Sequence, residues 1–234
     1  MKVGTDGVLL GAWASLPETA PSNGHSLSVL DIGTGTGIIA LMLAQRLAKA
    51  SMPFCVEAIE IDPEAASQAS DNFAASPWHT QLCVHSLSLN DFEMTLDPSH
   101  RYDLIACNPP FFNATLKPDD ALRATARHKD ALPPADILRF ASHFLTPEGR
   151  LALIYPSQLD TEMMTAAVLS GLHPVRICDV VTKVGKPSKR RLTEFSATPD
   201  VIPTRHQLAI RNSEGHYTDD YRSLTDAFYL HLSD

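Results

Sequence analysis

The sequence predicts an α/β fold, because short apolar, strand-like runs alternate with helix-like stretches over most of the chain. Alternation of this kind is typical of a parallel sheet with helices on both faces. Two later strand-like runs, 175–182 and 192–197, follow each other with no helix between them. We therefore predict a doubly wound, mostly parallel, seven-stranded Rossmann-like sheet with a late antiparallel strand pair, formed by a single domain over residues 1–234.

The composition narrows the class of protein. The chain has 234 residues, 44% of them hydrophobic, and a formal net charge of −8 at pH 7. This hydrophobic content suffices for a packed core and excludes a disordered chain. The negative charge argues against indiscriminate binding of polyanions. No apolar run approaches the roughly 18 residues that a membrane span needs, so we expect a soluble, cytoplasmic protein.

The cysteines and histidines show no spacing typical of a metal site. Each cysteine lies within an apolar, strand-like run, and none of the ten histidines forms a metal-binding pattern with its sequence neighbours. We therefore predict buried free thiols in a reducing compartment and no metal. The four cysteines are Cys55, Cys83, Cys107 and Cys178.

The predicted elements begin with a short apolar helix that Thr5 or Asp6 caps and that ends near Leu16. A buried strand over 28–32 and a helix over 38–48 come next. The later elements, in order, are a strand over 54–62, a helix over 63–75, strands over 82–85 and 102–107, a helix over 135–145, a strand over 149–155, a helix over 159–170, the strands 175–182 and 192–197, a candidate short edge strand over 207–211, and an amphipathic helix over 217–232.

A glycine-rich turn, Gly33-Thr34-Gly35-Thr36-Gly37, joins the first strand to the helix after it. Its glycines let a ligand approach the backbone, and the helix start offers free N–H groups. Such a turn fits nicotinamide, flavin and S-adenosylmethionine proteins alike. The spacing differs from Gly-x-Gly-x-x-Gly, and Asp31 precedes it. A carboxylate there can hold the ammonium group of S-adenosylmethionine but would repel a pyrophosphate, or it can simply cap the turn.

Several polar residues fall at the ends of predicted strands. Glu60 lies at the tip of the second strand, where a carboxylate can accept hydrogen bonds from a ribose. Glu60 or Asp62 can instead cap the helix that Pro63 opens, and for Asp62 that is the preferred interpretation. Ligands bind beyond the carboxyl ends of parallel strands, so we expect one shared site. The candidate cofactor-binding residues are Thr5, Asp31, Gly33, Thr34, Gly35, Gly37, Glu60, Ile61, Ser88 and Asn108.

The fourth strand ends in Asn108-Pro109-Pro110-Phe111-Phe112, because two prolines cannot extend a central strand. The Asn108 amide oxygen and the Pro109 carbonyl can accept the two hydrogens of a planar NH₂ group, while Phe111 can stack on the ring that carries it. Pro110 would keep the turn rigid, and the role of Phe112 is undecided. We therefore predict that 108–111 form the catalytic turn; a plain turn beside a core phenylalanine is the alternative.

Two stretches concentrate positive charge on this acidic chain. Basic patches on an acidic protein suit a selective nucleic-acid site better than a general one. A solvated basic turn is the alternative interpretation. The candidate RNA-binding residues are Arg123, Arg127, Lys186, Lys189, Arg190 and Arg191.

The motifs also carry a family resemblance. The stretch 29–37 resembles motif I of class I S-adenosylmethionine-dependent methyltransferases. Residues 108–111 resemble the (Asn/Asp/Ser)-Pro-Pro-(Tyr/Phe/Trp) motif of their amino-methylating branch. Ser88 stands where that branch often has Asp near the cofactor adenine. Four further stretches resemble bacterial tRNA (adenine-N6)-methyltransferases: 2–13, 76–78, 124–127 and 224–230.

The resemblance covers essentially the whole chain and implies methyl transfer from S-adenosylmethionine to the N6 amine of an adenine in tRNA. The implied target lies beside the anticodon of valine tRNA, and the implied by-product is S-adenosylhomocysteine. Nearby alternatives are a guanine-N2 methyltransferase of rRNA and a glutamine-N5 methyltransferase of protein, because the same turn grips any planar NH₂. More distant alternatives are a nicotinamide-dependent oxidoreductase and a non-catalytic RNA-binding module.

Overall fold

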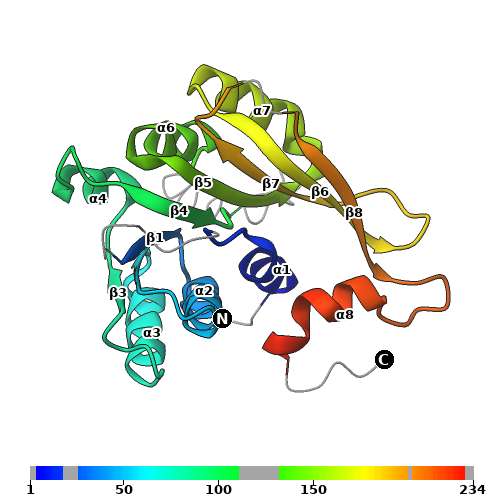
Figure 1. Cartoon of the computed structure of the whole chain (residues 1–234), viewed down its shortest axis with the longest axis horizontal. Helices are drawn as coiled ribbons and strands as arrows, with labels where there is room; N and C mark the ends of the chain where they lie inside the picture. Colours follow the sequence, from blue (N-terminus) through cyan, green and yellow to red (C-terminus); the bar gives the residue numbers. More distant parts are fainter. Residues whose placement is uncertain (1–3, 18–25, 111–131, 200–201, 230–234) are drawn as a thin grey trace, which may run out of the picture.

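The computed structural model of the chain describes residues 4–17, 26–110, 132–199 and 202–229. These residues form one sheet with a layer of helices on each face (Figure 1). The sheet has eight strands in the order β3-β2-β1-β4-β5-β7-β6-β8. The strands are β1 (Leu27–Ile32), β2 (Phe54–Ile59), β3 (Leu82–His85), β4 (Tyr102–Cys107), β5 (Leu145–Pro156), β6 (His173–Lys183), β7 (Arg190–Ser196) and β8 (Thr204–Arg211).

The strand directions confirm the predicted sheet. Strand β7 is antiparallel to both of its neighbours, and the other pairings are parallel. The count differs from the seven strands expected, because the candidate edge strand is a full member. It begins at Thr204 and pairs with β6 from Arg176 to Lys183. This pairing satisfies backbone groups that β6 would otherwise expose.

Seven α-helices of the described residues divide between the two faces of the sheet (Figure 1). Helices α1, α2, α3 and α8 cover one face, and α4, α6 and α7 cover the other. None of the described helices has the length and apolar character that crossing a membrane requires. The helices are α1 (Thr5–Trp13), α2 (Ile38–Lys49), α3 (Pro63–Ala74), α4 (Leu89–Thr95), α6 (Pro134–Phe144), α7 (Asp160–Leu169) and α8 (Asp219–Thr225).

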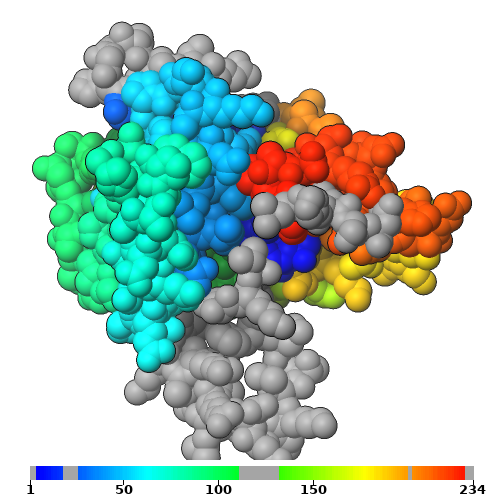
Figure 2. All heavy atoms as spheres, turned by 90° about the horizontal axis from the view of Figure 1, so that it is seen from below, coloured from blue at the N-terminus to red at the C-terminus, as the bar shows by residue number. Residues whose placement is uncertain are grey.

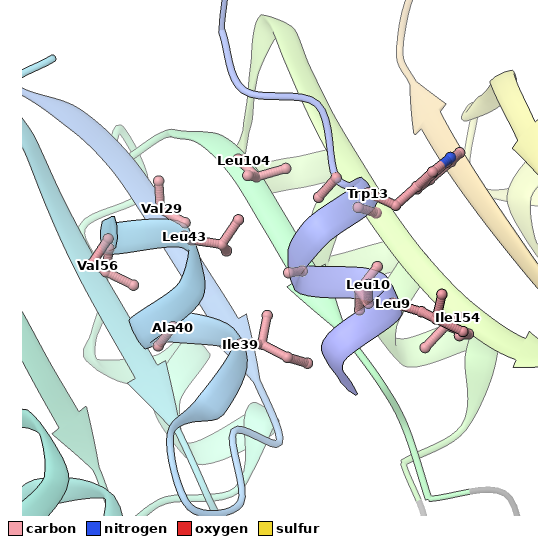
Figure 3. Packing of buried hydrophobic residues seen from close by; sticks show 14 of the residues in the cluster. Leu9, Leu10, Trp13, Val29, Ile39, Ala40, Leu43, Val56, Leu104 and Ile154 are labelled. Carbon is pink, nitrogen blue, oxygen red and sulfur yellow. The ribbon is translucent and has the colours of Figure 1, made fainter. Parts of the chain in front are cut away.

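The central strands are buried on both faces, so their side chains fill two hydrophobic layers. On β4, Leu104 packs with the α1 and α2 layer, whereas Ile105 packs with the α6 and α7 layer. Figure 3 shows Leu10 of α1 and Leu43 of α2 over the same face of the sheet. Removing one such buried leucine side chain typically costs about 2–5 kcal/mol. The two layers hold the strand ends in fixed positions.

Helix α1 packs beside α2 and begins differently from expectation. Gly4 occupies the N-cap position, so the predicted caps by Thr5 or Asp6 are wrong. The Asp6 carboxylate instead accepts a 2.7 Å hydrogen bond from Nε of Arg190 on β7. Arg46 of α2 donates to two carbonyls near the end of α1. Long-range partners therefore fix α1 where local capping was expected.

Two further helices depart from the sequence prediction. Helix α4 was not predicted; Ser88 caps it by accepting a 3.1 Å hydrogen bond from the Asp91 N–H. Helix α8 is shorter than expected: Thr218 caps its start, and a 3₁₀ turn, η3 (Asp226–Phe228), follows it. The predicted residues 230–232 lie outside the described part of the chain. Figure 2 shows α8 beside α2 on the face that also contains α1.

The topology places two functional stretches at one edge of the sheet. The chain runs outward from β1 through β2 to β3 and then returns to β4 on the other side of β1. Such a reversal opens a crevice beyond the carboxyl ends of the neighbouring strands. Strand β6 is parallel to β5, since both are antiparallel to β7. The basic connection 184–189 therefore leaves from this same edge.

Candidate active site

A cavity of about 490 Å³ lies at the carboxyl ends of β1, β2 and β4. This volume falls within the range of small-molecule sites. Its walls come from the glycine turn, the ends of β2 and β4, and the starts of α1, α4 and α6. The site residues predicted from the sequence that line it are Gly33, Thr34, Gly35, Glu60, Ile61, Ser88, Asn108, Pro109 and Pro110.

The glycine turn depends on conformations that other residues rarely adopt. Gly33, Gly35 and Gly37 have φ values of 68°, 60° and 87°. The backbone N–H groups of Gly33 and Thr34 donate to the Ile59 carbonyl at 2.9 and 3.0 Å, which fastens the turn to β2. A Cβ on Gly37 would lie 2.5 Å from Cε1 of Phe73. The backbone at the front of the turn is thus open to a ligand, while Gly37 packs against α3.

Asp31 lies behind this turn and is fully buried. Its Oδ2 accepts hydrogen bonds from the Thr34 hydroxyl at 2.5 Å and the Ala40 N–H at 3.2 Å. Its Oδ1 has no hydrogen-bond partner among the described residues. Burial raises the pKa of Asp31 to about 7, although the bonds from Thr34 and Ala40 oppose the rise.

The geometry of Asp31 corresponds to the capping alternative. Within the described part of the chain, neither Asp31 nor Gly37 nor Thr5 belongs to the cavity lining. Gly4 and Gly7 line it in place of Thr5. Direct contact of Asp31 with a cofactor ammonium group stays a prediction. Thr34, whose hydroxyl donates to Asp31, is the residue that lines the cavity.

Glu60 and Ile61 present a carboxylate beside an apolar surface. Glu60 Oε2 accepts a 2.8 Å hydrogen bond from the Gly35 N–H, and Oε1 accepts one of 3.0 Å from the Asp62 N–H. Ile61 is 46% exposed, which is unusual for a large apolar side chain. Asp62 accepts from the Glu64 N–H and caps α3, as the sequence predicted. Glu60 therefore links the second strand to the glycine turn.

Ser88 and Asn90 lie where α4 begins. The Ser88 hydroxyl donates to Asp91 at 2.7 Å and also accepts from the Asp91 N–H. A hydroxyl oxygen has two lone pairs, so Ser88 can accept one more hydrogen bond. Asn90 and Asp136 line the cavity but were not predicted. Asn90 was not predicted because helix α4, on which it lies, was not predicted. Asp136 was not predicted because its place in the lining depends on how α6 packs, and no local sequence pattern indicates that.

The Asn108-Pro109-Pro110 turn, predicted to bind the amine, lines the same cavity. Asn108 is half-buried, Pro109 is buried and Pro110 is exposed. The three follow β4 directly, and they share the lining with Pro133, the N-cap of α6, and with Asp136 in its first turn. Phe111 and Phe112 lie outside the described residues. The structure thus brings the asparagine and both prolines to the glycine turn.

The predicted RNA-binding residues divide into two groups. Arg191 is held between Asp160 and Asp179, and its Nη2 lies 2.7 Å from Asp179 Oδ1. Arg190 is paired with Asp6. Carboxylates of the protein thus already pair with both cations, and the expectation that they face phosphates stays a prediction. Lys186 and Lys189 are exposed, whereas Arg123 and Arg127 lie outside the described residues.

Comparison with known proteins gives a consistent picture. Residues 13–178 match the model of the family described as methyltransferase small domain. A tRNA1(Val) (adenine(37)-N6)-methyltransferase from Photobacterium profundum is 41% identical over 99% of this chain and 92% of its own length. The enzyme of the same name from Edwardsiella ictaluri is 39% identical over 98% of this chain and 87% of its own length.

Solved structures share the fold. A predicted O-methyltransferase, Atu636 from Agrobacterium tumefaciens, superimposes with a TM-score of 0.68 at 18% identity, covering 98% of this chain and all of the other. The glycopeptide N-methyltransferase MtfA, solved with S-adenosylmethionine, gives a TM-score of 0.52 at 10% identity over 76% of this chain and 90% of its own. At these identities the likeness concerns the fold alone.

Proposed function

Because the chain belongs to the methyltransferase small domain family, we propose that it transfers a methyl group from S-adenosylmethionine to the N6 amine of adenine 37 in tRNA1(Val). Two relatives of that name match nearly the whole chain at 39–41% identity, which supports the substrate assignment. The observation that carries the chemistry is the single cavity lined by both Gly33–Gly35 and Asn108–Pro110. We also propose one domain over 1–234 and, since the substrate is tRNA, a cytoplasmic location.

The cavity residues fit this cofactor. Among the described residues, no atom lies within 4 Å of a Cβ added to Gly33, so the front of the turn leaves room for a ligand. The Glu60 carboxylate can accept hydrogen bonds from ribose hydroxyls, and Ile61 offers an apolar surface to a flat ring. Ser88 has accepting capacity left for an adenine amine. Asp31 Oδ1 is buried behind Thr34 without a partner among the described residues, and we propose that it interacts with the cofactor's ammonium group through water.

When bound, the cofactor supplies an electrophilic sulfonium methyl group. The residues of the chain act on the other reactant, whose amine is a poor nucleophile because its lone pair is delocalised into the ring. Asn108 and the Pro109 carbonyl would accept the two N–H groups and favour a pyramidal nitrogen. Catalysis of this kind depends on positioning and electrostatics. In the proposed transfer an N–C bond forms as the S–CH₃ bond breaks, one amine proton is released to solvent, and S-adenosylhomocysteine is the by-product. The transfer uses no metal.

The target base must leave its stack to reach this cavity, which costs least in a single-stranded loop. We propose that Phe111 stacks on the flipped base. Lys186 and Lys189 are exposed on a connection that leaves the same edge of the sheet, where phosphates of the tRNA can reach them. Arg123 and Arg127 are proposed for the same role.

The assignment is tested with labelled S-adenosylmethionine and three separate substrates: total tRNA, ribosomal RNA and a protein extract. We expect label in tRNA, recovered as N6-methyladenosine after digestion and mass analysis. Label only in ribosomal RNA as a methylguanosine, or only in protein, would replace the substrate assignment with one of the alternatives. Binding of NADH without binding of S-adenosylhomocysteine would overturn the methyltransferase assignment itself.

A further inference from the structure

A second group of reactive side chains lies on the sheet, outside the cavity described above. Glu57 comes from β2, and Cys83 and His85 come from β3 at the sheet edge. Their donor atoms all lie within 4.8 Å of one another. Cys83 and His85 are two residues apart on one strand and therefore project from the same face. The register Glu57↔Cys83 places the carboxylate beside them.

Two of the three distances within this group are close to those between ligands of one metal ion. His85 Nε2 lies 3.4 Å from Glu57 Oε1 and 3.7 Å from Cys83 Sγ. Around a tetrahedral zinc ion, with bonds of about 2.0–2.3 Å, neighbouring N, O and S ligand atoms lie about 3.3–3.6 Å apart. One carboxylate, one thiol and one imidazole are the ligand types that zinc accepts. The donors thus need only small movements to close on an ion.

Neighbouring groups orient the carboxylate as in known metal sites. The Tyr102 hydroxyl donates to Glu57 Oε2 at 2.8 Å, which leaves Oε1 directed toward His85. Metal-binding carboxylates usually have such a supporting hydrogen bond. His100 Nε2 lies 3.7 Å from the same Oε2 and is buried without a hydrogen-bond partner among the described residues. This second imidazole contacts the other carboxylate oxygen, so it supports Glu57 and is not one of the three ligands.

The Glu57 carboxylate places a negative charge beside the Cys83 thiol. The Glu57 carboxylate contacts the imidazole rings of His85 and His100 in the described structure. A divalent cation would offset this charge and replace the thiol proton, which is released to solvent. The prediction of buried thiols is wrong for Cys55 and Cys83, which are exposed on β2 and β3. An ion can therefore reach Cys83 from solvent.

We propose that Glu57, Cys83 and His85 bind a thiophilic divalent cation of the Zn²⁺ class, at the sheet edge and apart from the methyl-transfer cavity. The ion would fasten β3 to β2. The His85 carbonyl accepts from the N–H groups of Glu60 and Leu87, both of which line the cavity, at 3.1 Å each. The bound ion would therefore also stabilise the segments that carry those two residues.

The test uses the whole protein after treatment with a chelator and its removal. Co²⁺ is added first, because a cobalt–thiolate bond gives a charge-transfer band in the near ultraviolet, and Zn²⁺ is then titrated in competition. We expect one ion per chain, a thiolate band, and a thermal midpoint that Zn²⁺ raises. Cys83→Ser should abolish the band and the thermal shift, and His85→Gln should weaken Zn²⁺ binding at least about tenfold.

Cys55→Ser is the matched control, because Cys55 is an exposed thiol on the adjoining strand β2 and does not belong to the group. It should keep the band and the affinity of the wild-type protein. The proposal is overturned if the wild-type protein shows no thiolate band, if the band survives in Cys83→Ser, or if Cys55→Ser removes it. Unchanged Zn²⁺ affinity in His85→Gln would equally contradict it.

Discussion

Gly33 and Asn108 come together at the carboxyl edge of the sheet, because the residues just before them, Ile32 and Cys107, are register partners on β1 and β4. Both line the same cavity. The turn proposed to hold the methyl donor and the turn proposed to hold the amine are thus joined through the backbone of adjacent strands. This rigid connection places two groups that must react within one site.

Asn108→Ala should lower turnover strongly while leaving cofactor binding nearly unchanged. The variant loses an acceptor for the amine but keeps the glycine turn and Glu60. The loss of one positioned hydrogen-bonding group at a reacting centre typically lowers kcat by about 10²–10³-fold. Single-turnover methylation and equilibrium binding of S-adenosylhomocysteine measure the two properties separately. Near-normal turnover would mean that Asn108 does not hold the amine.

Gly37→Ala should destabilise the fold more than Gly171→Ala. Both glycines have positive φ, at 87° and 71°, so each substitution introduces backbone strain of about 1–2 kcal/mol. Among the described residues, no atom lies within 4 Å of a Cβ on Gly171, whereas one on Gly37 meets Phe73. The clash should add about 1–3 kcal/mol. Equal losses in the free energy of unfolding, measured with denaturant, would show that the turn moves freely away from α3.

Arg191→Ala and Lys189→Ala should affect different properties. Removing Arg191 leaves Asp160 and Asp179 without their shared cation, which should cost about 1–3 kcal/mol of unfolding free energy. Lys189→Ala should leave stability unchanged but weaken tRNA binding, with a salt dependence reduced by about one phosphate contact. Denaturation and binding at several salt concentrations distinguish the two roles. If Lys189→Ala binds tRNA like the wild-type protein at low salt, the basic connection is not part of the RNA surface.

The stability contribution of Asp31 should decrease as pH rises. Burial raises its pKa from 3.8 to about 7, so the folded state binds the proton more tightly than the unfolded state does. Between these two values the folded state carries the extra proton, and its stability falls with increasing pH. Asp31→Asn removes this group, so the unfolding free energy of the variant relative to wild type should rise from pH 5 to pH 8. A constant difference over that range would contradict the raised pKa.

The sequence predicted those parts of the fold that depend on local patterns. The glycine turn, the Asn-Pro-Pro turn and the Asp62 cap all combine residue types whose preferences act within a few positions. The strands on either side of them were apolar runs, and alternation with helices fixed their direction. The position of the cavity could be predicted from these elements, because parallel strands place their carboxyl ends at one edge of the sheet.

The features that were missed depend on partners distant in the sequence. From the sequence, Arg190 and Arg191 were interpreted as unpaired cations. In the fold they form ion pairs with Asp6, Asp160 and Asp179, which are distant in the sequence. Whether Asp31 lines the cavity or lies behind the glycine turn depends on its burial, which the sequence alone does not indicate. The grouping of Glu57 with Cys83 and His85 depended on the register between β2 and β3, which spacing along the chain does not reveal.

The most direct test of the proposed function uses two transcripts of tRNA1(Val), one with adenine and one with guanine at position 37. Each is incubated with the protein and labelled S-adenosylmethionine, and the nucleosides are separated after digestion. The account predicts label in the adenine transcript alone, recovered as N6-methyladenosine. Equal labelling of both transcripts, or a methyl group on any other nucleoside, would contradict it.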